Sequence, residues 1–137
     1  MSLLLAINII FTMLFGMNQD EFIYLTKTVE AEAGICDHME KIAVTKVIIA
    51  RVESDEFPNT VIDVIQQKGQ FQVYANLRLF KVKVSNHTTK AVIKALTSSR
   101  RDYGTYFCNY DIANNKEWFD TLNVIYEGEY MTYYEER

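Results

Sequence analysis

The sequence predicts a single domain of the α+β class, with helices first and a small antiparallel sheet at its carboxyl end. Apolar residues recur at helical spacing in several segments between residues 21 and 96, whereas alternating and aromatic residues dominate from residue 103 onward. The chain of 137 residues is 49% hydrophobic, which is enough for one core and short for two domains of ordinary size.

Charge and cysteine content exclude several classes of function. The net charge is −4, from 14 basic and 18 acidic residues, so the chain lacks the basic surplus that nucleic-acid binding requires. Two cysteines are too few for a disulfide scaffold, and no Cys-x-x-Cys pair or Cys/His cluster indicates a zinc site. We therefore expect no metal, no cofactor and no nucleic-acid partner.

The two cysteines leave three interpretations open. Cys36 and Cys108 are typical of buried free thiols, or they form one optional disulfide. A thiol nucleophile would need one of them paired with His87, because Cys36 and His38 are two residues apart and would not face each other on a helix.

Residues 1–19 form an apolar amino-terminal segment ahead of a domain expected over residues 20–137. Residues 3–17 are interrupted only by Asn8, Thr12 and Gly16. Their length suits the apolar region of a signal peptide and is short for a transmembrane helix, but a charged leader and an Ala-x-Ala cleavage site are missing. An export signal, a membrane anchor and a helix packed on the domain stay open, and any membrane contact is expected only through residues 3–17.

The first helix of the domain is predicted over residues 21–33. Gly34 is placed to end it, and its apolar residues are three and four positions apart: Phe22, Leu25 and Val29. At about 100° per residue, Glu32 lies on the edge of this apolar face, whereas Glu30 points to the side shared with Lys27.

Glu32 is the acid that such a face would desolvate. Burial disfavours the charged carboxylate and raises its pKa toward the range that a general acid needs. The alternative is a structural carboxylate satisfied by an arginine or by backbone donors. The helical periodicity makes Glu32 a candidate but does not decide between a general acid and a structural carboxylate.

A second helix is predicted over residues 38–52. Asp37 and Glu40 have the spacing of a capping box, and the apolar residues that follow cover most of the circumference, as in a central buried helix. Arg51 lies near the carboxyl end of this helix, where a positive charge is stabilised by the helix dipole. The alternative is that Arg51 pairs with an acid of an active site.

Residues 57–60 predict a turn into a short helix that carries Val61, Val64 and Ile65 and that Gly69 would end. An irregular stretch with amides and aromatic rings follows: Gln70, Phe71, Tyr74 and Asn76. Such side chains suit sugar binding, because amides hydrogen-bond hydroxyl and acetamido groups while rings cover the apolar faces of pyranoses. Turn-capping amides and core aromatics are the alternative.

The rest of the chain predicts strands around one more helix. Alternation over residues 80–84 indicates a strand, and a helix over residues 88–96 follows a cap at Ser85 or Asn86. Residues 103–110 predict another strand, and residues 122–134 predict a hairpin that turns at Glu127-Gly128. This sheet would bring Tyr106 and Asn109 to a cleft beside the helical half.

Short motifs follow one another in a characteristic order along residues 20–134. They are Val29-Glu30-Ala31-Glu32-Ala33, Ile42-Ala43-Val44, Ile49-Ala50-Arg51-Val52, Phe57-Pro58-Asn59-Thr60-Val61, Val64-Ile65, Gly69-Gln70-Phe71, Gly104 with Tyr106-Phe107 and Asn109, and Trp118. Together they resemble the SleB/CwlJ-type cell-wall hydrolases, also called spore-cortex-lytic enzymes. The combination is much more specific than any single motif.

This resemblance implies a lysozyme-like α+β domain that cuts the glycan strand of peptidoglycan between N-acetylmuramic acid and N-acetylglucosamine, often as a lytic transglycosylase. The catalytic glutamate of the family falls on Glu32, the residue that the helical face also nominates. Gln70, Phe71, Asn109 and Tyr106 become candidate substrate contacts, with Trp118 nearby. The expected place of action is the cell wall, reached by secretion or by phage delivery, as for an endolysin.

One carboxyl is enough for a lytic transglycosylase. Hydrolysis usually requires a second Asp or Glu at a defined separation from the first, and no candidate stands out by spacing among Asp63, Asp111 and Glu117. The sequence therefore favours transglycosylation, in which Glu32 serves as acid and then as base.

The chain departs from the family pattern in three places. Gly34-Ile35-Cys36 replaces the usual Arg-Gly-Glu, Ala50 replaces an Asn, and Tyr130 replaces a His. A changed loop beside the acid keeps two alternatives open. The first is a non-enzymatic wall-binding or virion structural module on the same fold, and the second is a Cys-dependent amidase or peptidase.

Overall fold

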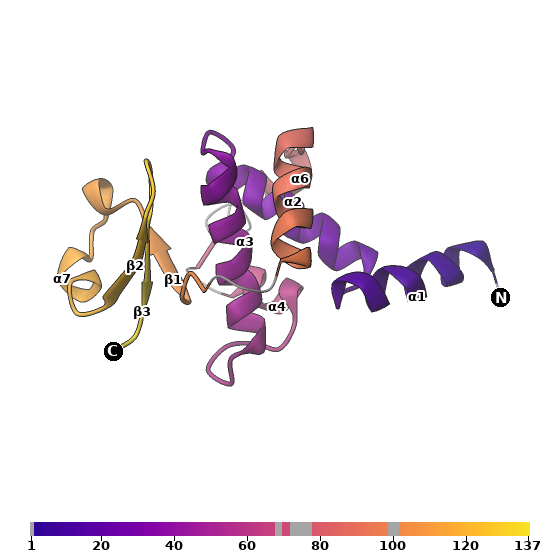
Figure 1. The fold of residues 1–137 in the computed structure, drawn as a ribbon, viewed down its shortest axis with the longest axis horizontal. Helices are drawn as coiled ribbons and strands as arrows, with labels where there is room; N and C mark the ends of the chain where they lie inside the picture. Colours follow the sequence, from indigo (N-terminus) through magenta and orange to yellow (C-terminus); the bar gives the residue numbers. More distant parts are fainter. Residues whose placement is uncertain (1, 68–69, 72–77, 99–101) are drawn as a thin grey trace.

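The computed structural model describes residues 2–67, 70–71, 78–98 and 102–137 (Figure 1). Its elements in chain order are α1 (Leu3–Phe15), α2 (Gln19–Ala33), α3 (His38–Glu53), α4 (Val61–Gln66), a 3₁₀ turn η1 (Arg78–Lys81), α6 (Asn86–Thr97), β1 (Tyr106–Cys108), a 3₁₀ turn η2 (Tyr110–Ile112), α7 (Lys116–Phe119), β2 (Asn123–Glu127) and β3 (Thr132–Glu135). The expectations for Gly69, Tyr74 and Asn76 lie outside the described residues.

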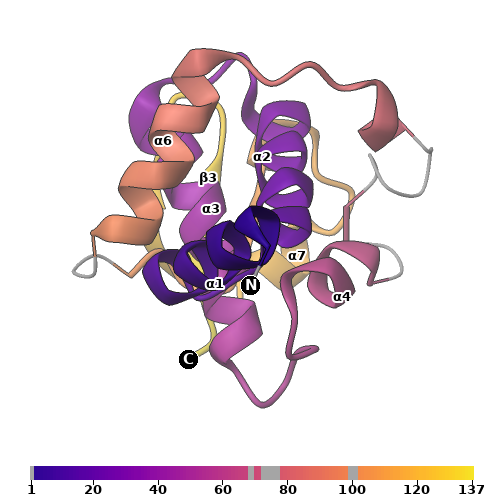
Figure 2. The same ribbon diagram turned by 90° about the vertical axis from the view of Figure 1, so that its right-hand side faces the viewer.

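The α+β prediction is confirmed. Helices α2, α3, α4 and α6 form one half of the domain, and the small sheet with α7 forms the other, while α1 projects from the helical half on the side away from the sheet (Figure 1). The view along the long axis shows α2 and α6 on either side of α3 (Figure 2). The domain therefore has a helical side, a sheet side and a junction between them.

Helix α2 begins at a capping box and ends where the sequence predicts. The Asn18 side chain accepts a hydrogen bond from the Glu21 N–H, and the Glu21 carboxylate accepts one from the Asn18 N–H. Leu25, Val29 and Ala33 are fully buried, so the apolar face lies against the core. Gly34 follows the last residue with a right-handed backbone (φ −57°), so no left-handed glycine cap ends this helix.

Helix α3 is the central helix, as predicted. Its buried residues are Glu40, Lys41, Ile42, Ala43, Val44, Thr45, Val47, Ile48 and Arg51. The Asp37 carboxylate caps its first turn by accepting a 2.8 Å hydrogen bond from the Glu40 N–H. The expected reciprocal half of the capping box is wrong, because the Glu40 carboxylate bonds instead to the turn between β2 and β3.

The strand expected over residues 80–84 is also wrong. Residues 78–81 form η1, and residues 82–85 run without regular structure into the Ser85 cap of α6. Alternation of apolar residues predicts a strand only where a neighbouring strand supplies hydrogen bonds. In the described residues, η1 contacts α2, and the Ser85 N–H that follows donates to the Glu30 carboxylate of α2.

The sheet is antiparallel with strand order β1-β3-β2, which confirms the predicted hairpin. The first strand is shorter than the expected 103–110, because the chain turns into η2 from Tyr110. Gly104, which precedes β1, has a φ of 73° that favours glycine, and a Cβ there would overlap the Tyr134 carbonyl. Because β3 lies between β1 and β2, it is the central strand. Its residues Tyr133 and Tyr134 are buried in the core.

Candidate active site

A groove of about 650 Å³ lies at the junction of the helical side and the sheet side. The helical side contributes Glu32, Arg51 and Gln70. The sheet side and the segment after it contribute the remaining lining residues, which are Tyr106, Phe107, Cys108, Asn109, Ile112, Ala113, Asn114, Asn115, Trp118, Phe119 and Met131. Amides and aromatic rings make up much of this list, as in a site for a sugar.

Glu32 is the acid of this groove. It lies in the last turn of α2, one residue before the fully buried Ala33. Burial raises the pKa of its carboxyl above the usual value, and no charged neighbour contributes to the shift. Among the residues that the structure describes, Glu32 is the only Asp or Glu that lines the groove.

Glu30, two residues earlier on the same helix, has a structural role. Its carboxylate accepts hydrogen bonds from the Ser85 N–H at 2.7 Å and from the Thr88 hydroxyl at 2.9 Å, which fasten the start of α6 to α2. Burial alone raises the pKa of Glu30, but these hydrogen bonds and the charge of Lys41 outweigh it, and the pKa is lowered. The two neighbouring acids therefore have pKa shifts of opposite sign.

Arg51 organises the floor of the groove. It is 4% exposed, and its guanidinium donates to the Thr105 carbonyl at 2.7 Å and to the Gln70 side-chain oxygen at 3.0 Å. Three aromatic rings surround it within 6 Å, those of Phe57, Phe71 and Tyr106. Burial lowers the pKa of Arg51 to about 10, so it stays charged at neutral pH. Its partners are an amide and a carbonyl rather than the acid that the sequence suggested.

The structure brings three of the four predicted substrate contacts to the groove wall. Gln70, Tyr106 and Asn109 line it together with Glu32. Trp118 lies edge-on against Tyr106, with ring centroids 5.0 Å apart, and is 41% exposed. These side chains present two amides and two accessible ring systems beside one acid.

The expectation for Phe71 needs correction. Its side chain is 3% exposed and does not line the groove. The ring packs under the Arg51 guanidinium and near Phe107, so Phe71 supports the groove from the core. The sequence pattern of an aromatic residue next to an amide does not show whether the ring faces a ligand or the core.

Comparison with known proteins assigns the family. A sequence model described as cell wall hydrolase matches residues 37–134. The chain belongs to the cell wall hydrolase family. A search of curated protein sequences found no match.

Two solved structures resemble this cell wall hydrolase. The catalytic domain of the germination-specific lytic transglycosylase SleB from Bacillus anthracis has 27% identity and a TM-score of 0.77, covering 88% of this chain and 98% of that chain. The catalytic domain of the Bacillus cereus SleB protein has 26% identity and a TM-score of 0.76, covering 86% of this chain and 91% of that chain. These matches confirm the predicted SleB/CwlJ-type family, the lysozyme-like fold and a peptidoglycan-degrading enzyme.

Glu40 has a structural role beside the groove that its spacing in the sequence does not reveal. It is fully buried, and its carboxylate accepts hydrogen bonds from the backbone N–H groups of Tyr130 and Met131, while its carbonyl accepts one from the Tyr133 hydroxyl. Gly128 approaches so closely that a Cβ there would overlap the carboxylate. Because Met131 lines the groove, Glu40 fixes the sheet wall against α3.

The Asn114-Asn115 pair also lines the groove without a sequence motif that predicts it. Its only sequence signal is a pair of turn-forming residues just before the short helix α7, which reads as an ordinary loop. No local pattern distinguishes a turn amide that faces a ligand from one that faces solvent.

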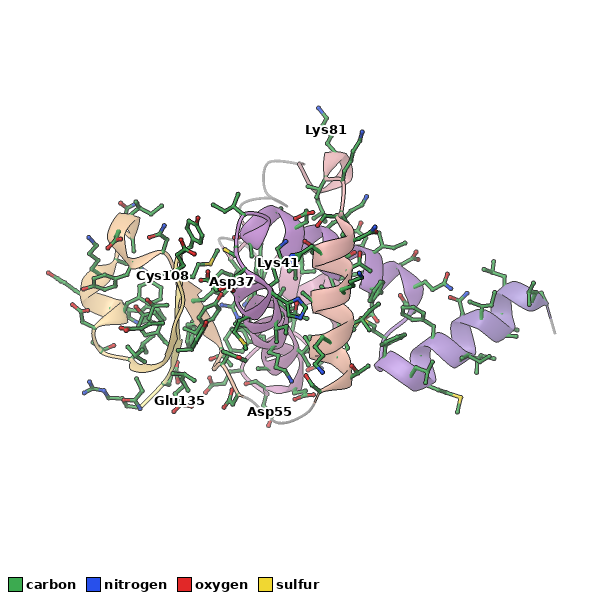
Figure 3. All side chains as sticks on the ribbon, turned by 45° about the horizontal axis from the view of Figure 1, so that its top comes forward. Asp37, Lys41, Asp55, Lys81, Cys108 and Glu135 are labelled. Carbon is green, nitrogen blue, oxygen red and sulfur yellow. The ribbon has the colours of Figure 1, made fainter. Side chains whose placement is uncertain are left out.

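The cysteines do not form a catalytic pair with histidine in the structure. The His87 Nδ1 atom lies 2.9 Å from the Lys41 ammonium, on the side of α3 that faces α6. Figure 3 shows Cys108 in the sheet, apart from Lys41. Burial, with the nearby charge of Glu40, raises the pKa of the Cys36 thiol to about 12, which disfavours the nucleophilic thiolate.

A second hollow, of about 560 Å³, lies between α3 and α6. Its acids, Glu53 and Asp102, are both exposed. It therefore lacks a desolvated carboxyl, and the groove around Glu32 is the stronger candidate for catalysis. No group of three or more His, Cys, Asp or Glu that could hold a metal occurs within the described residues.

Proposed function

We propose that this cell wall hydrolase cleaves the glycan strand of peptidoglycan between N-acetylmuramic acid and N-acetylglucosamine as a lytic transglycosylase, with Glu32 as its acid and base. The observation that carries the proposal is a groove with one desolvated carboxyl among amides and aromatic rings. The family match begins at Asp37, so the role of Glu32 is supported by this groove rather than by that match. The lytic transglycosylase activity named for the Bacillus anthracis relative supports the reaction type.

In the first step, the protonated Glu32 carboxyl donates its proton to the oxygen that bridges the two sugars. The bond between this oxygen and the C1 atom of N-acetylmuramic acid breaks, and the N-acetylglucosamine part leaves with a hydroxyl group. Positive charge develops at C1 and its ring oxygen. A carboxyl whose pKa is raised by burial is protonated over a wider pH range and is therefore suited to this step.

In the second step, the Glu32 carboxylate removes the proton of the C6 hydroxyl of the same muramic residue. The O6 atom then bonds to C1 and closes a 1,6-anhydro ring, while Glu32 regains the proton that it donated. The reaction consumes no water and leaves the enzyme in its starting state. One carboxyl therefore performs both proton transfers.

Hydrolysis usually requires a second carboxyl. Most glycoside hydrolases place a second carboxyl about 5 to 9.5 Å from the first, where it acts as nucleophile or activates water. Within the described residues, no second Asp or Glu lines this groove. The sequence candidates do not supply one, because none of them lines the groove: Asp63 is exposed in the first turn of α4, and Asp111 and Glu117 are also exposed.

The remaining groove residues are proposed to hold the saccharide. Gln70 and Asn109 offer amides to hydroxyl and acetamido groups, and Tyr106 with Trp118 offers rings to the apolar sugar faces. Arg51 fixes the Gln70 side chain by their 3.0 Å hydrogen bond, so it acts on substrate through Gln70. We place the action in the cell wall, reached by secretion or by phage delivery.

Release of soluble muropeptides from purified peptidoglycan tests this function. The expected result is release by the wild type and loss of release by Glu32→Gln. Binding to peptidoglycan without any release by the wild type would instead support a wall-binding or virion structural module on this fold.

A further inference from the structure

Helix α1 exposes apolar side chains along its whole length. The helix spans 13 residues, and residues 1–19 contain no charged side chain. Eight of its large apolar residues are 41% to 80% exposed: Leu3, Leu4, Leu5, Ile7, Ile9, Ile10, Met13 and Leu14. No residue of α1 is buried. Solvation of so much apolar surface is unfavourable, so this surface indicates a binding partner.

The contact of α1 with the rest of the domain is confined to its carboxyl end. Phe11 and Phe15 pack on Phe22 of α2, with ring centroids 5.1 Å and 5.9 Å apart. A glycine at residue 16 with a φ of 70° then separates α1 from α2. The amino-terminal part of the helix projects from the domain (Figures 1 and 2).

The distribution of the exposed residues around the helix identifies the partner. Leu3, Leu4 and Leu5 alone point in three directions about 100° apart, so apolar surface faces every side. A protein groove or a second copy of the helix would cover one stripe and leave the others in water. Acyl chains of a lipid bilayer surround a helix completely and carry no charge, which matches the charge-free segment.

The length of α1 limits how deep it can reach. Thirteen residues at about 1.5 Å each span roughly 20 Å, whereas the hydrocarbon core of a bilayer is about 30 Å thick. No single described helix is long and apolar enough to cross a membrane, and α1 passes that test only together with α2, across a bend of 55°. Asp20 and Glu21 lie in the first turn of α2, and their charges favour water over the apolar part of a bilayer.

We infer that α1 inserts into one leaflet of a lipid bilayer and tethers the catalytic domain to the membrane surface. The groove lies at the junction with the sheet, and the sheet lies on the side of the helical half that faces away from α1 (Figure 1). A domain anchored in this way presents the groove away from the lipid. The inference does not depend on the proposed reaction, since neither α1 nor its lipid contact includes a residue of the groove.

Vesicle flotation of the full chain tests the tether. The protein is exchanged from mild detergent onto phosphatidylcholine vesicles and onto vesicles that also contain phosphatidylglycerol, each at low and at high salt. We expect it to float with both compositions at both salt concentrations, because the uncharged helix binds by its apolar surface. A protein that stays at the bottom of the gradient, as a monomer or as a dimer, would overturn the inference.

A pair of matched variants assigns the effect to α1. Leu4→Lys with Ile10→Lys places two charges on α1 side chains that are 64% and 56% exposed and that make no core contact, and it should lower vesicle partitioning at least about tenfold. Ile93→Lys with Val124→Lys adds the same charge to α6 and β2 and should float like the wild type. Equal flotation of both pairs, or equal loss in both, would overturn the inference.

The mature protein from its own source gives a second, independent outcome. Mass spectrometry of the membrane fraction should detect residues 3–17 still attached to the domain. Removal of α1 from the mature chain would overturn the tether, because the helix would then serve only in export.

Discussion

The Glu40 carboxylate on α3 accepts a 2.8 Å hydrogen bond from the backbone N–H of Met131, 91 residues later in the chain. The same carboxylate also accepts from the Tyr130 N–H, and Glu40 itself is fully buried. A buried anion whose lone pairs are satisfied by backbone donors holds its position firmly. This contact therefore fixes the distance between the helical side of the groove and the wall at Met131.

Replacement of Glu40 by alanine should destabilise the domain strongly. The change removes a fully buried, charge-assisted acceptor and takes away the hydrogen-bond partner of the Tyr130 and Met131 N–H groups. We expect the free energy of unfolding to fall by about 3 kcal/mol, measured by urea denaturation.

Glu129→Ala is the matched control for Glu40→Ala. Glu129 is exposed in the same turn, so its loss should change the free energy of unfolding by less than about 0.5 kcal/mol. Similar losses in the two variants would show that the turn, and not the buried carboxylate, determines the effect.

Arg51→Lys should impair catalysis while the charge is kept. A lysine ammonium cannot reproduce the flat guanidinium among three rings or donate in one plane to both Thr105 and Gln70. We expect kcat/KM on purified glycan strands to fall by about tenfold, mainly through KM, because Gln70 loses its orientation.

A double-mutant cycle with Gln70→Ala checks this explanation. If Arg51 acts through Gln70, the two changes together should cost little more than the larger of the two alone. Fully additive losses in kcat/KM would mean that Arg51 affects the reaction by another route.

Alkylation of the cysteines should leave activity intact. With a pKa of about 12, only about one Cys36 thiol in ten thousand is ionised at pH 8, and burial also raises the pKa of Cys108. Iodoacetamide at pH 8 should therefore modify the folded protein slowly, as followed by intact mass. Rapid modification of Cys36, which does not line the groove, together with loss of muropeptide release would favour the thiol alternative.

The pH dependence of activity should follow Glu32. The first step needs the protonated carboxyl, so the rate should fall as pH rises through the raised pKa of Glu32. A pH–rate profile for kcat/KM measures this limb. Glu32→Gln should lose this fall in kcat/KM. If its residual activity still falls at the same pH as that of the wild type, the fall belongs to another group.

Stability should depend on Glu32 and Glu30 with opposite signs. Between the ordinary pKa and the raised pKa of Glu32, the native state binds more protons than the unfolded state, so stability falls as pH rises. Glu30 has a lowered pKa, so it stabilises above the ordinary pKa, and this is lost as pH falls through the lowered one. At neutral pH, thermal melts should show Glu32→Gln at least as stable as the wild type and Glu30→Gln less stable.

The sequence predicts those parts of the fold that depend on neighbouring residues. The spacing of Leu25 and Val29 predicts α2 and the inward direction of Glu32, and the apolar run of α3 predicts its central place. Asp37 predicts the start of α3, and Ser85 is the one of the two caps expected for α6 that the structure uses, because a helix cap involves residues only three apart. These features need no knowledge of distant contacts.

Features set by distant contacts could not be predicted in this way. Glu40 has the spacing of a capping residue, but a turn 90 residues away offers its carboxylate better donors. Phe71 has its ring against Arg51 instead of the groove, and the run at residues 80–84 alternates without a strand to pair with. In each case a partner remote in sequence decides the outcome.

Mass spectrometry of digested peptidoglycan tests the role of Glu32 most directly. Wild type should release muropeptides that end in 1,6-anhydro-N-acetylmuramic acid, and Glu32→Gln should lower their yield by at least about 100-fold. Glu30→Gln makes the same chemical change two residues away, outside the groove, and should release the same anhydro products as the wild type. Anhydro products from Glu32→Gln at the wild-type rate would contradict the account, as would reducing ends alone from the wild type.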